Sequence, residues 1–163
     1  QQRWGVQVEA RALITPTGRM ALELQGRPEF TAAFVRHLGA SFLAGFRLLD
    51  HAPDLARVVE SNAGLLVVAS LFGAALDGPS GPDGTAVPVS ISSLAARFGI
   101  ARAHVRNLLA DAAEAGLVRR TGESETVVVL PRLVRAGSDF FAALFAVLAH
   151  CALATAEEIG AAS

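Results

Sequence analysis

This chain of 163 residues lacks several residue types that particular functions require. It has no lysine and no tyrosine, a single cysteine and four histidines. One cysteine, Cys151, excludes an internal disulfide framework and fits a reducing compartment, so we expect a cytoplasmic protein. The glycine-rich stretch GPSGPDG, residues 78–84, has no lysine and no strand-to-helix setting, which excludes a nucleotide-binding phosphate loop there.

Clustered metal ligands and catalytic groups are missing as well. His150 and Cys151 are adjacent in sequence, whereas zinc ligands are spaced so that they can converge on one ion. No combination of acid, base and nucleophile can be identified. We therefore expect no metal site, no cofactor and no enzymatic activity.

Charged residues are few and unevenly distributed. They make up 18% of the chain, and the net charge is −1. Residues 90–135 hold seven arginines and four acidic residues, a charge of +3, whereas residues 1–89 carry −1 and residues 136–163 carry −3. The basic excess in the middle of the chain suits a nucleic-acid partner.

Hydrophobic residues are abundant, at 52% of the chain. With so little charge to cover its surface, we expect the protein to bury apolar surface against a second subunit. The longest apolar run is FFAALFAVLAHCALATA, and its 17 residues are fewer than the roughly 20 that span a bilayer. This run predicts a helix buried between protein surfaces, without a membrane partner.

Apolar periodicity predicts a mainly helical chain. Phe30, Phe34, Leu38, Phe42 and Phe46 recur every four residues, which predicts a helix over Glu29–Leu49. Further helices are predicted over Pro53–Leu76, Ser90–Ile100, Ala101–Ala115 and Ser138–Ile159, the last with Ser138 as its N-cap. Short strands are predicted over residues 6–14 and 86–90 and on both sides of a turn at 121–125.

The third and fourth of these helices have the pattern of a helix-turn-helix. Each carries one apolar face, made by Leu94, Phe98 and Ile100 on the first and by Val105, Leu108, Leu109 and Ala112 on the second. Ala95 is small enough for a close helix crossing, and Gly99 at the bend can adopt the positive φ that a tight turn requires.

The polar side of the second helix carries side chains that can read DNA. Facing away from its apolar face are Arg102, Ala103, Arg106, Asn107 and Ala110, with His104 beside them. Arginine binds guanine and asparagine binds adenine through paired hydrogen bonds. Phosphate contacts are assigned to Arg97, Arg119, Arg120, Arg132 and Arg135. The alternatives are a solvated helix face for the arginines, partial burial for His104 and bonding to water for Asn107.

The stretch SSLAARFGIARAHVRNLLADAAEAGLVRR, residues 92–120, resembles the MarR-like winged-helix transcriptional regulators. The matching residues are Leu94-Ala95, Gly99-Ile100, Arg102, Val105, Leu108-Leu109, Gly116-Leu117-Val118 and Arg119-Arg120, without a gap. The resemblance covers about a quarter of the chain. It implies a homodimer that binds a palindromic DNA site, with terminal helices forming the interface.

Two features depart from the family pattern. Ala101 stands where a serine commonly caps the recognition helix, and the hairpin turn holds Glu123 and Glu125 where a wing that enters the minor groove carries basic residues. Residues 14–22, ITPTGRMAL, also resemble the exit of such a wing and its following helix. Residues 1–28 are therefore left as an uncertain segment, with the end of an upstream winged helix as one interpretation.

We predict a mainly α fold in which a winged helix-turn-helix DNA-binding domain, residues 53–135, lies between dimerisation helices over 29–52 and 136–163. The predicted function is sequence-specific binding of double-stranded DNA by a homodimeric transcription regulator. The residues expected to contact DNA are Arg97, Arg102, Ala103, His104, Arg106, Asn107, Arg119 and Arg120.

Two other functions remain open at this point. One is a winged helix used for protein–protein assembly, which the acidic hairpin turn suits, and the other is a ligand sensor with little direct DNA binding. Control of DNA binding by a small-molecule effector is compatible with the regulator hypothesis. The candidate pocket residues are Phe30, Phe34, Phe42 and Phe46, for which plain core or dimer interface is the commoner role.

Overall fold

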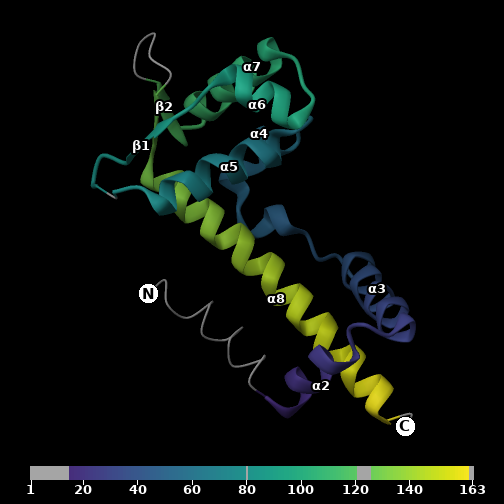
Figure 1. Ribbon diagram of the computed structural model, residues 1–163. Helices are drawn as coiled ribbons and strands as arrows, with labels where there is room; N and C mark the ends of the chain where they lie inside the picture. The colour runs from purple at the N-terminus through teal and green to yellow at the C-terminus, as the bar shows by residue number, and fades with distance from the viewer. Residues whose placement is uncertain (1–14, 80, 121–125, 162–163) are drawn as a thin grey trace. The chain divides into compact units, whose positions relative to one another are not determined.

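The computed structural model describes residues 15–79, 81–120 and 126–161, and it is mainly helical with one small three-stranded sheet (Figure 1). This confirms the mainly α prediction. The described residues divide into two compact units, a first unit of residues 15–51 and 141–161 and a second unit of residues 52–140. The helix α8, Pro131–Ala161, contributes its beginning to the second unit and the remainder to the first.

The first unit is built from two helices packed on the later part of α8. Helix α2 covers Pro16–Leu24, with the Thr15 hydroxyl accepting a hydrogen bond from the Gly18 amide, and α3 covers Pro28–Leu43. The core of the unit brings all three helices together, through Ala21 and Leu24 of α2, Phe30 of α3 and Ala156 of α8.

Helix α3 ends earlier than predicted. The periodic phenylalanines predicted a helix as far as Leu49, but α3 ends at Leu43 and only a short 3-10 helix, η1, follows at Leu48–His51. Gly45 has a φ of 102°, a conformation that stops a helix and that glycine adopts readily. The Arg47 guanidinium then donates hydrogen bonds to the carbonyls of Phe42 and Phe46, which satisfies acceptors that the ended helix leaves open.

The helix predicted over Pro53–Leu76 is interrupted in the structure. It consists of a 3-10 helix η2, Pro53–Leu55, a single α-helical turn α4, Ala56–Val59, and helix α5, Gly64–Asp77. The chain turns between α4 and α5 with Ala63 at a φ of 60°, so the predicted continuous helix is wrong. The apolar run of α5 contributes Val67, Val68 and Leu71 to the core, as its composition predicts.

The rest of the second unit alternates short strands with helices. The order is β1, Thr85–Pro88, α6, Ile91–Phe98, α7, Arg102–Glu114, β2, Val118–Arg120, and β3, Thr126–Val129. Strand β3 lies between β1 and β2 and is antiparallel to both, with Val129 opposite Thr85 on one side and Val118 on the other. The strand predicted over residues 6–14 and the hairpin turn at 121–125 lie outside the described residues.

Helix α8 begins at Pro131, seven residues earlier than the predicted start at Ser138. Ser138 does not cap a helix, because its hydroxyl donates to the Val134 carbonyl one turn earlier. Leu133, Ala136 and Phe140 are buried at helical spacing, which explains why the helix extends back to Pro131.

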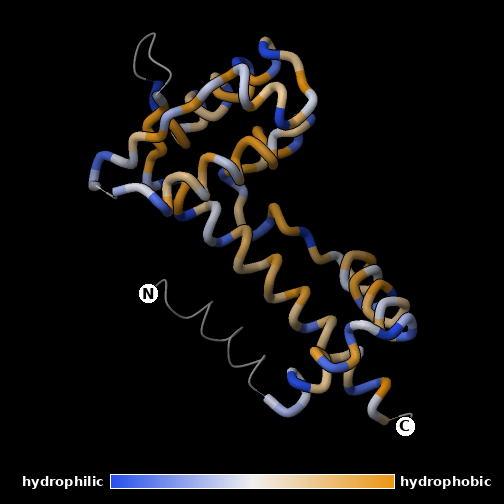
Figure 2. Tube along the Cα trace, viewed as in Figure 1, coloured by the Kyte–Doolittle hydropathy of each residue, from blue (hydrophilic) through white to orange (hydrophobic). Residues whose placement is uncertain are grey.

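At 31 residues, α8 is long and apolar enough to cross a membrane when judged by length and composition alone. Figure 2 shows hydrophobic colours along much of its length. Both ends of the helix nevertheless have protein partners, since Leu133 and Ala136 are buried in the second unit and Cys151, Thr155 and Ala156 are fully buried in the first.

Candidate functional site

Helices α6 and α7 form a tightly connected pair in the second unit (Figure 1). The Ser90 hydroxyl caps α6 by accepting a hydrogen bond from the Ser93 amide. Gly99 ends α6 in the left-handed conformation, with a φ of 64°, and the Ile100 amide then bonds back to the Ala95 carbonyl. Only Gly99, Ile100 and Ala101 separate the two helices, whereas the predicted helices adjoined at Ile100 and Ala101.

Helix α7 has one fully buried side and one side open to solvent. Val105, Leu108, Leu109 and Ala112 are almost completely buried. The exposed residues of its first two turns are Arg102, Ala103, Arg106 and Asn107, the same residues that the sequence placed on the presenting side. Because the buried side is packed and the backbone is helical, these side chains are held on a rigid element.

The two arginines of this exposed side differ from several others in the protein. Within the described ranges, Arg102 and Arg106 make no ion pair, whereas Arg36, Arg57 and Arg132 each bind a carboxylate. An arginine that binds a carboxylate of its own chain uses some of its guanidinium N–H donors for that contact. The guanidinium groups of Arg102 and Arg106 are available to an external acceptor.

The acidic residues of α7 lie at its other end and are already paired. Arg57 of α4 binds Glu114, and its guanidinium lies 3.3 Å from an Asp111 carboxylate oxygen. These contacts place a cation beside the negative charges of the last turn and a half of α7. The unpaired positive charge of the helix is therefore concentrated in its N-terminal half.

His104 has an internal role that the sequence did not reveal. Its Nε2 atom lies 2.7 Å from the Asn62 carbonyl oxygen, in the turn between α4 and α5. This bond joins α7 to a segment 42 residues away in sequence. The bond makes His104 a residue that helps to position α7, and its predicted contact with DNA stays a prediction.

The other residues predicted to contact DNA differ in whether their side chains already bind another residue. Arg119 and Arg120 are exposed on β2, and Arg97 is exposed on α6, with its guanidinium 5.3 Å from the centre of the Phe98 ring. Arg132, however, donates two hydrogen bonds to Asp54, and these bonds hold the pKa of the Asp54 carboxyl below its ordinary value. Arg132 is thus engaged in fixing the start of α8.

The four phenylalanines proposed as an effector pocket fall into two pairs within the first unit. Phe30 and Phe34 stack, with ring centres 6.4 Å apart, and both line a cavity of about 470 Å³. Phe42 and Phe46 pack edge to face at 5.8 Å and do not line it, and Phe46 also contacts His51. The sequence missed Phe145 of α8 as a lining residue because its place depends on how α8 packs on α2 and α3.

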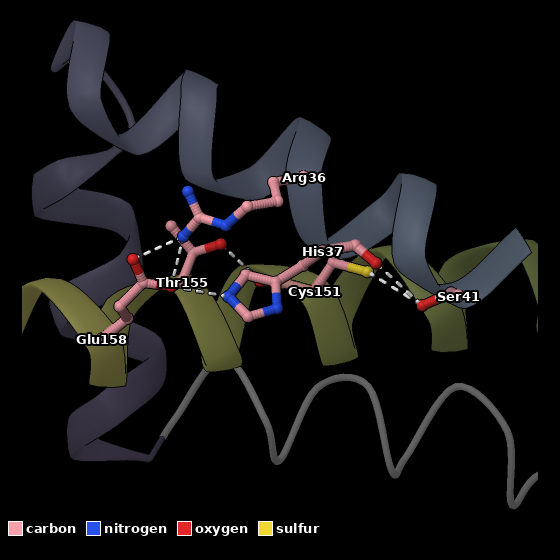
Figure 3. A network of polar contacts seen from close by, with 6 residues as sticks. All are labelled: Arg36, His37, Ser41, Cys151, Thr155 and Glu158. Atoms are coloured by element: carbon pink, nitrogen blue, oxygen red, sulfur yellow. Dashed lines mark hydrogen bonds and ion pairs between the residues drawn. The ribbon is translucent and has the colours of Figure 1, made fainter. Parts of the chain in front are cut away.

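A polar network joins α3 to α8 in the first unit (Figure 3). Glu158 of α8 binds Arg36 of α3, and its second oxygen lies 3.0 Å from Nε2 of His37. Farther along, the Ser41 hydroxyl donates to the His37 carbonyl and lies 3.8 Å from the buried Cys151 sulfur. Among residues 15–79, 81–120 and 126–161, no group of three or more metal-ligating side chains comes together.

Comparisons with protein families, with curated protein sequences and with solved structures find no match for this chain.

Proposed function

We propose that the second unit is a winged helix-turn-helix that binds double-stranded DNA with α7 in the major groove. Three features of the unit support this proposal. Helices α6 and α7 are joined by a three-residue turn at a left-handed glycine, a strand precedes the pair, and an antiparallel hairpin follows it. This arrangement leaves one long side of α7 uncovered, which a groove-binding helix requires.

The observation that carries the proposal is the separation of charge along α7. Recognition helices contact base edges mainly with their N-terminal residues, and this is where the exposed and unpaired Arg102 and Arg106 lie. Asn107 beside them can pair with adenine. The carboxylates that would repel phosphates are at the opposite end and bind Arg57. Phosphate contacts fall to Arg97, Arg119 and Arg120, which stay exposed.

We further propose that the protein acts as a homodimer through α3 of the first unit. Ala32, Val35, Gly39 and Phe42 are exposed at offsets of 3, 7 and 10 residues, the spacing of a helix that packs against another helix. Leu43 beside them is 92% exposed. A second copy would cover this face and present two α7 helices to successive major grooves, about 34–36 Å apart.

The proposal is tested by removing both arginines from α7. We expect Arg102→Ala combined with Arg106→Ala to weaken binding to a duplex, selected by the wild-type protein from a random library, by at least about tenfold for each lost base pair contact. The salt dependence of the remaining affinity should also become shallower, since fewer counterions are released. Fluorescence anisotropy at several salt concentrations measures both effects.

A matched control removes the same charge elsewhere. Arg19→Ala combined with Arg27→Ala deletes two exposed arginines of the first unit and should leave affinity for the duplex nearly unchanged. Equal losses for the two double variants would mean that only overall charge matters. Unchanged specific affinity of the Arg102 and Arg106 variant would contradict a reading role for α7.

One observation favours a second candidate function, a protein–protein assembly module. Residues 52–140 as a whole contain eight arginines and nine acidic residues, a net charge of −1, which is low for a DNA-binding unit. Such a module would show no saturable binding to any duplex and no steep salt dependence. The same anisotropy experiment on the wild-type protein therefore distinguishes the two functions.

A further inference from the structure

A cavity of about 470 Å³ lies within the first unit. Its walls come from the consecutive helices α2 and α3 and from α8, which is distant from both in sequence. The volume lies within the range of about 300–1,000 Å³ that small-molecule sites occupy.

Small side chains on two of the helices keep this space open. Gly18 and Ala21 of α2 line it, as do Ala149 and Ala152 of α8, at spacings of three residues that repeat on one side of each helix. The third wall is aromatic, with the rings of Phe30 and Phe34 only 13° from parallel. Because Leu22 and Phe145 in its walls are also about half exposed, this space opens to solvent and a small molecule can reach it.

The polar groups that line the cavity indicate which class of small molecule it can bind. Among the described residues no charged side chain lines it, so an ionic ligand would lose its hydration without gaining a counter-charge from them. Two polar side chains do line it, the Gln25 amide and the Thr31 hydroxyl, and both residues are also exposed, which places them where the cavity meets solvent. Together they can donate and accept hydrogen bonds.

The cavity is also distinct from the face proposed for dimerisation. None of the exposed apolar residues Val35, Phe42 and Leu43 lines it. Conversely, two of its own lining residues, Leu22 and Phe145, are 48% and 50% exposed although they are large and apolar. A molecule seated in the cavity would cover them, whereas a second copy docked on the exposed side of α3 uses other residues.

We propose that this cavity binds a neutral, flat, mainly hydrocarbon small molecule that carries one hydrogen-bonding group. The hydrocarbon part packs between the small residues and the stacked rings, and the polar group reaches Gln25 and Thr31 at the entrance. The site lies entirely within the first unit and uses none of the residues proposed to contact DNA.

The experiment uses the full chain and N-phenyl-1-naphthylamine, a neutral aromatic probe with one N–H whose fluorescence rises in apolar surroundings. Wild-type protein should bind it saturably with one site per chain. Ala149→Leu fills the cavity and should weaken binding by at least about tenfold, because the added methylenes occupy the space of the probe. Ala146→Leu is the matched control on the same helix, since Ala146 is exposed and does not line the cavity.

A second variant, Leu22→Asp, tests the proposal even if Ala149→Leu does not fold. Leu22 is half exposed, so Leu22→Asp should fold and yet place an unpaired charge beside the bound probe, again weakening binding about tenfold. Leu66→Asp, on an exposed leucine of α5, controls for the charge alone. Absence of saturable binding, or equal affinity in the wild-type, Ala149→Leu and Leu22→Asp proteins, would overturn the proposal.

Binding of the probe is expected to be independent of DNA binding. Protein carrying Arg102→Ala and Arg106→Ala should bind the probe as the wild-type protein does, so failure of either proposal is recognised separately.

Discussion

Gly64 occupies a position where no other residue fits. It begins α5 directly after the turn from α4, and its amide bonds to the Ser61 carbonyl. A Cβ atom added to Gly64 would lie 1.7 Å from the carbonyl oxygen of Val58, a backbone atom of a fully buried residue. Backbone cannot swing aside as the end of a long side chain can, so the connection between α4 and α5 depends on this glycine.

Gly64→Ala should therefore lower the free energy of unfolding by at least about 3 kcal/mol, the upper range for overpacking a well-filled site. Gly73→Ala is the control, because Gly73 is in the middle of the same helix and an added Cβ would meet no atom within 4 Å. It should raise stability by about 0.5–1 kcal/mol through the lower helix propensity of glycine. Urea denaturation followed by circular dichroism measures both, and a stable Gly64→Ala protein would mean that the α4–α5 turn differs from the one described.

At this scale, sequence reasoning was reliable for residues whose role is local. The positive φ of Gly99, the burial of Ala95 and the missing side-chain cap at Ala101 were all expected from their neighbours in sequence, and all three are present. The hydrogen bond of His104 was not expected, because its partner, Asn62, belongs to a turn that is distant in sequence. Apolar periodicity predicts which side of a helix is buried. It does not predict which carbonyl group of a distant segment lies beside a given side chain.

At the scale of elements, one carboxylate of α8 binds two side chains of α3. Hydrogen bonds from Arg36 and then from His37 hold the pKa of Glu158 below its ordinary value of 4.5. A carboxyl group with a lowered pKa in the folded state contributes stability above its unfolded pKa, and this contribution is lost as the pH falls through the folded value. The packing of α3 on α8 should consequently weaken in acid.

Glu158→Gln keeps the shape of the side chain and removes its charge. The variant should be less stable than the wild-type protein near neutral pH, and the difference in unfolding free energy should shrink as the pH falls below about 4.5 and disappear in stronger acid. Urea denaturation at a series of pH values measures this difference. Glu157→Gln is the control, because Glu157 has no ion pair within the described residues; a Glu158→Gln difference that stayed constant with pH would show that charge plays no part.

Helix boundaries show where the sequence could have been interpreted better. Proline is favoured at the first position of a helix, so Pro131 was an available signal for the start of α8, and Ser138 was misleading because serine also bonds within helices. Gly45 similarly marks the end of α3. The break before α5 had a weaker signal, since it depends on Ala63 adopting a positive φ that alanine rarely takes.

At the scale of the whole molecule, apolar side chains remain exposed on the first unit. The first unit exposes Val35, Phe42 and Leu43 on one helix, at a spacing that suits packing against a second helix. An added Cβ at Gly39, within the same stripe, would meet nothing within 4 Å, so another backbone can approach closely there. Composition alone predicted that some apolar surface would be covered, but only the structure identifies which side of α3 remains open.

We therefore expect a homodimer of 16.9 kDa chains that separates when charge is placed on this stripe. Val35→Glu combined with Leu43→Glu should give monomers at micromolar concentration, because burying two unpaired carboxylates in each subunit costs several kcal/mol. Both side chains are exposed within their own chain, at 60% and 92%, so the fold should persist and circular dichroism should be unchanged. Light scattering after size exclusion chromatography gives the mass directly.

The control is Leu76→Glu, at a leucine that is 58% exposed on α5, and this variant should remain dimeric. Dissociation by Leu76→Glu and not by the α3 variant would move the interface to the second unit.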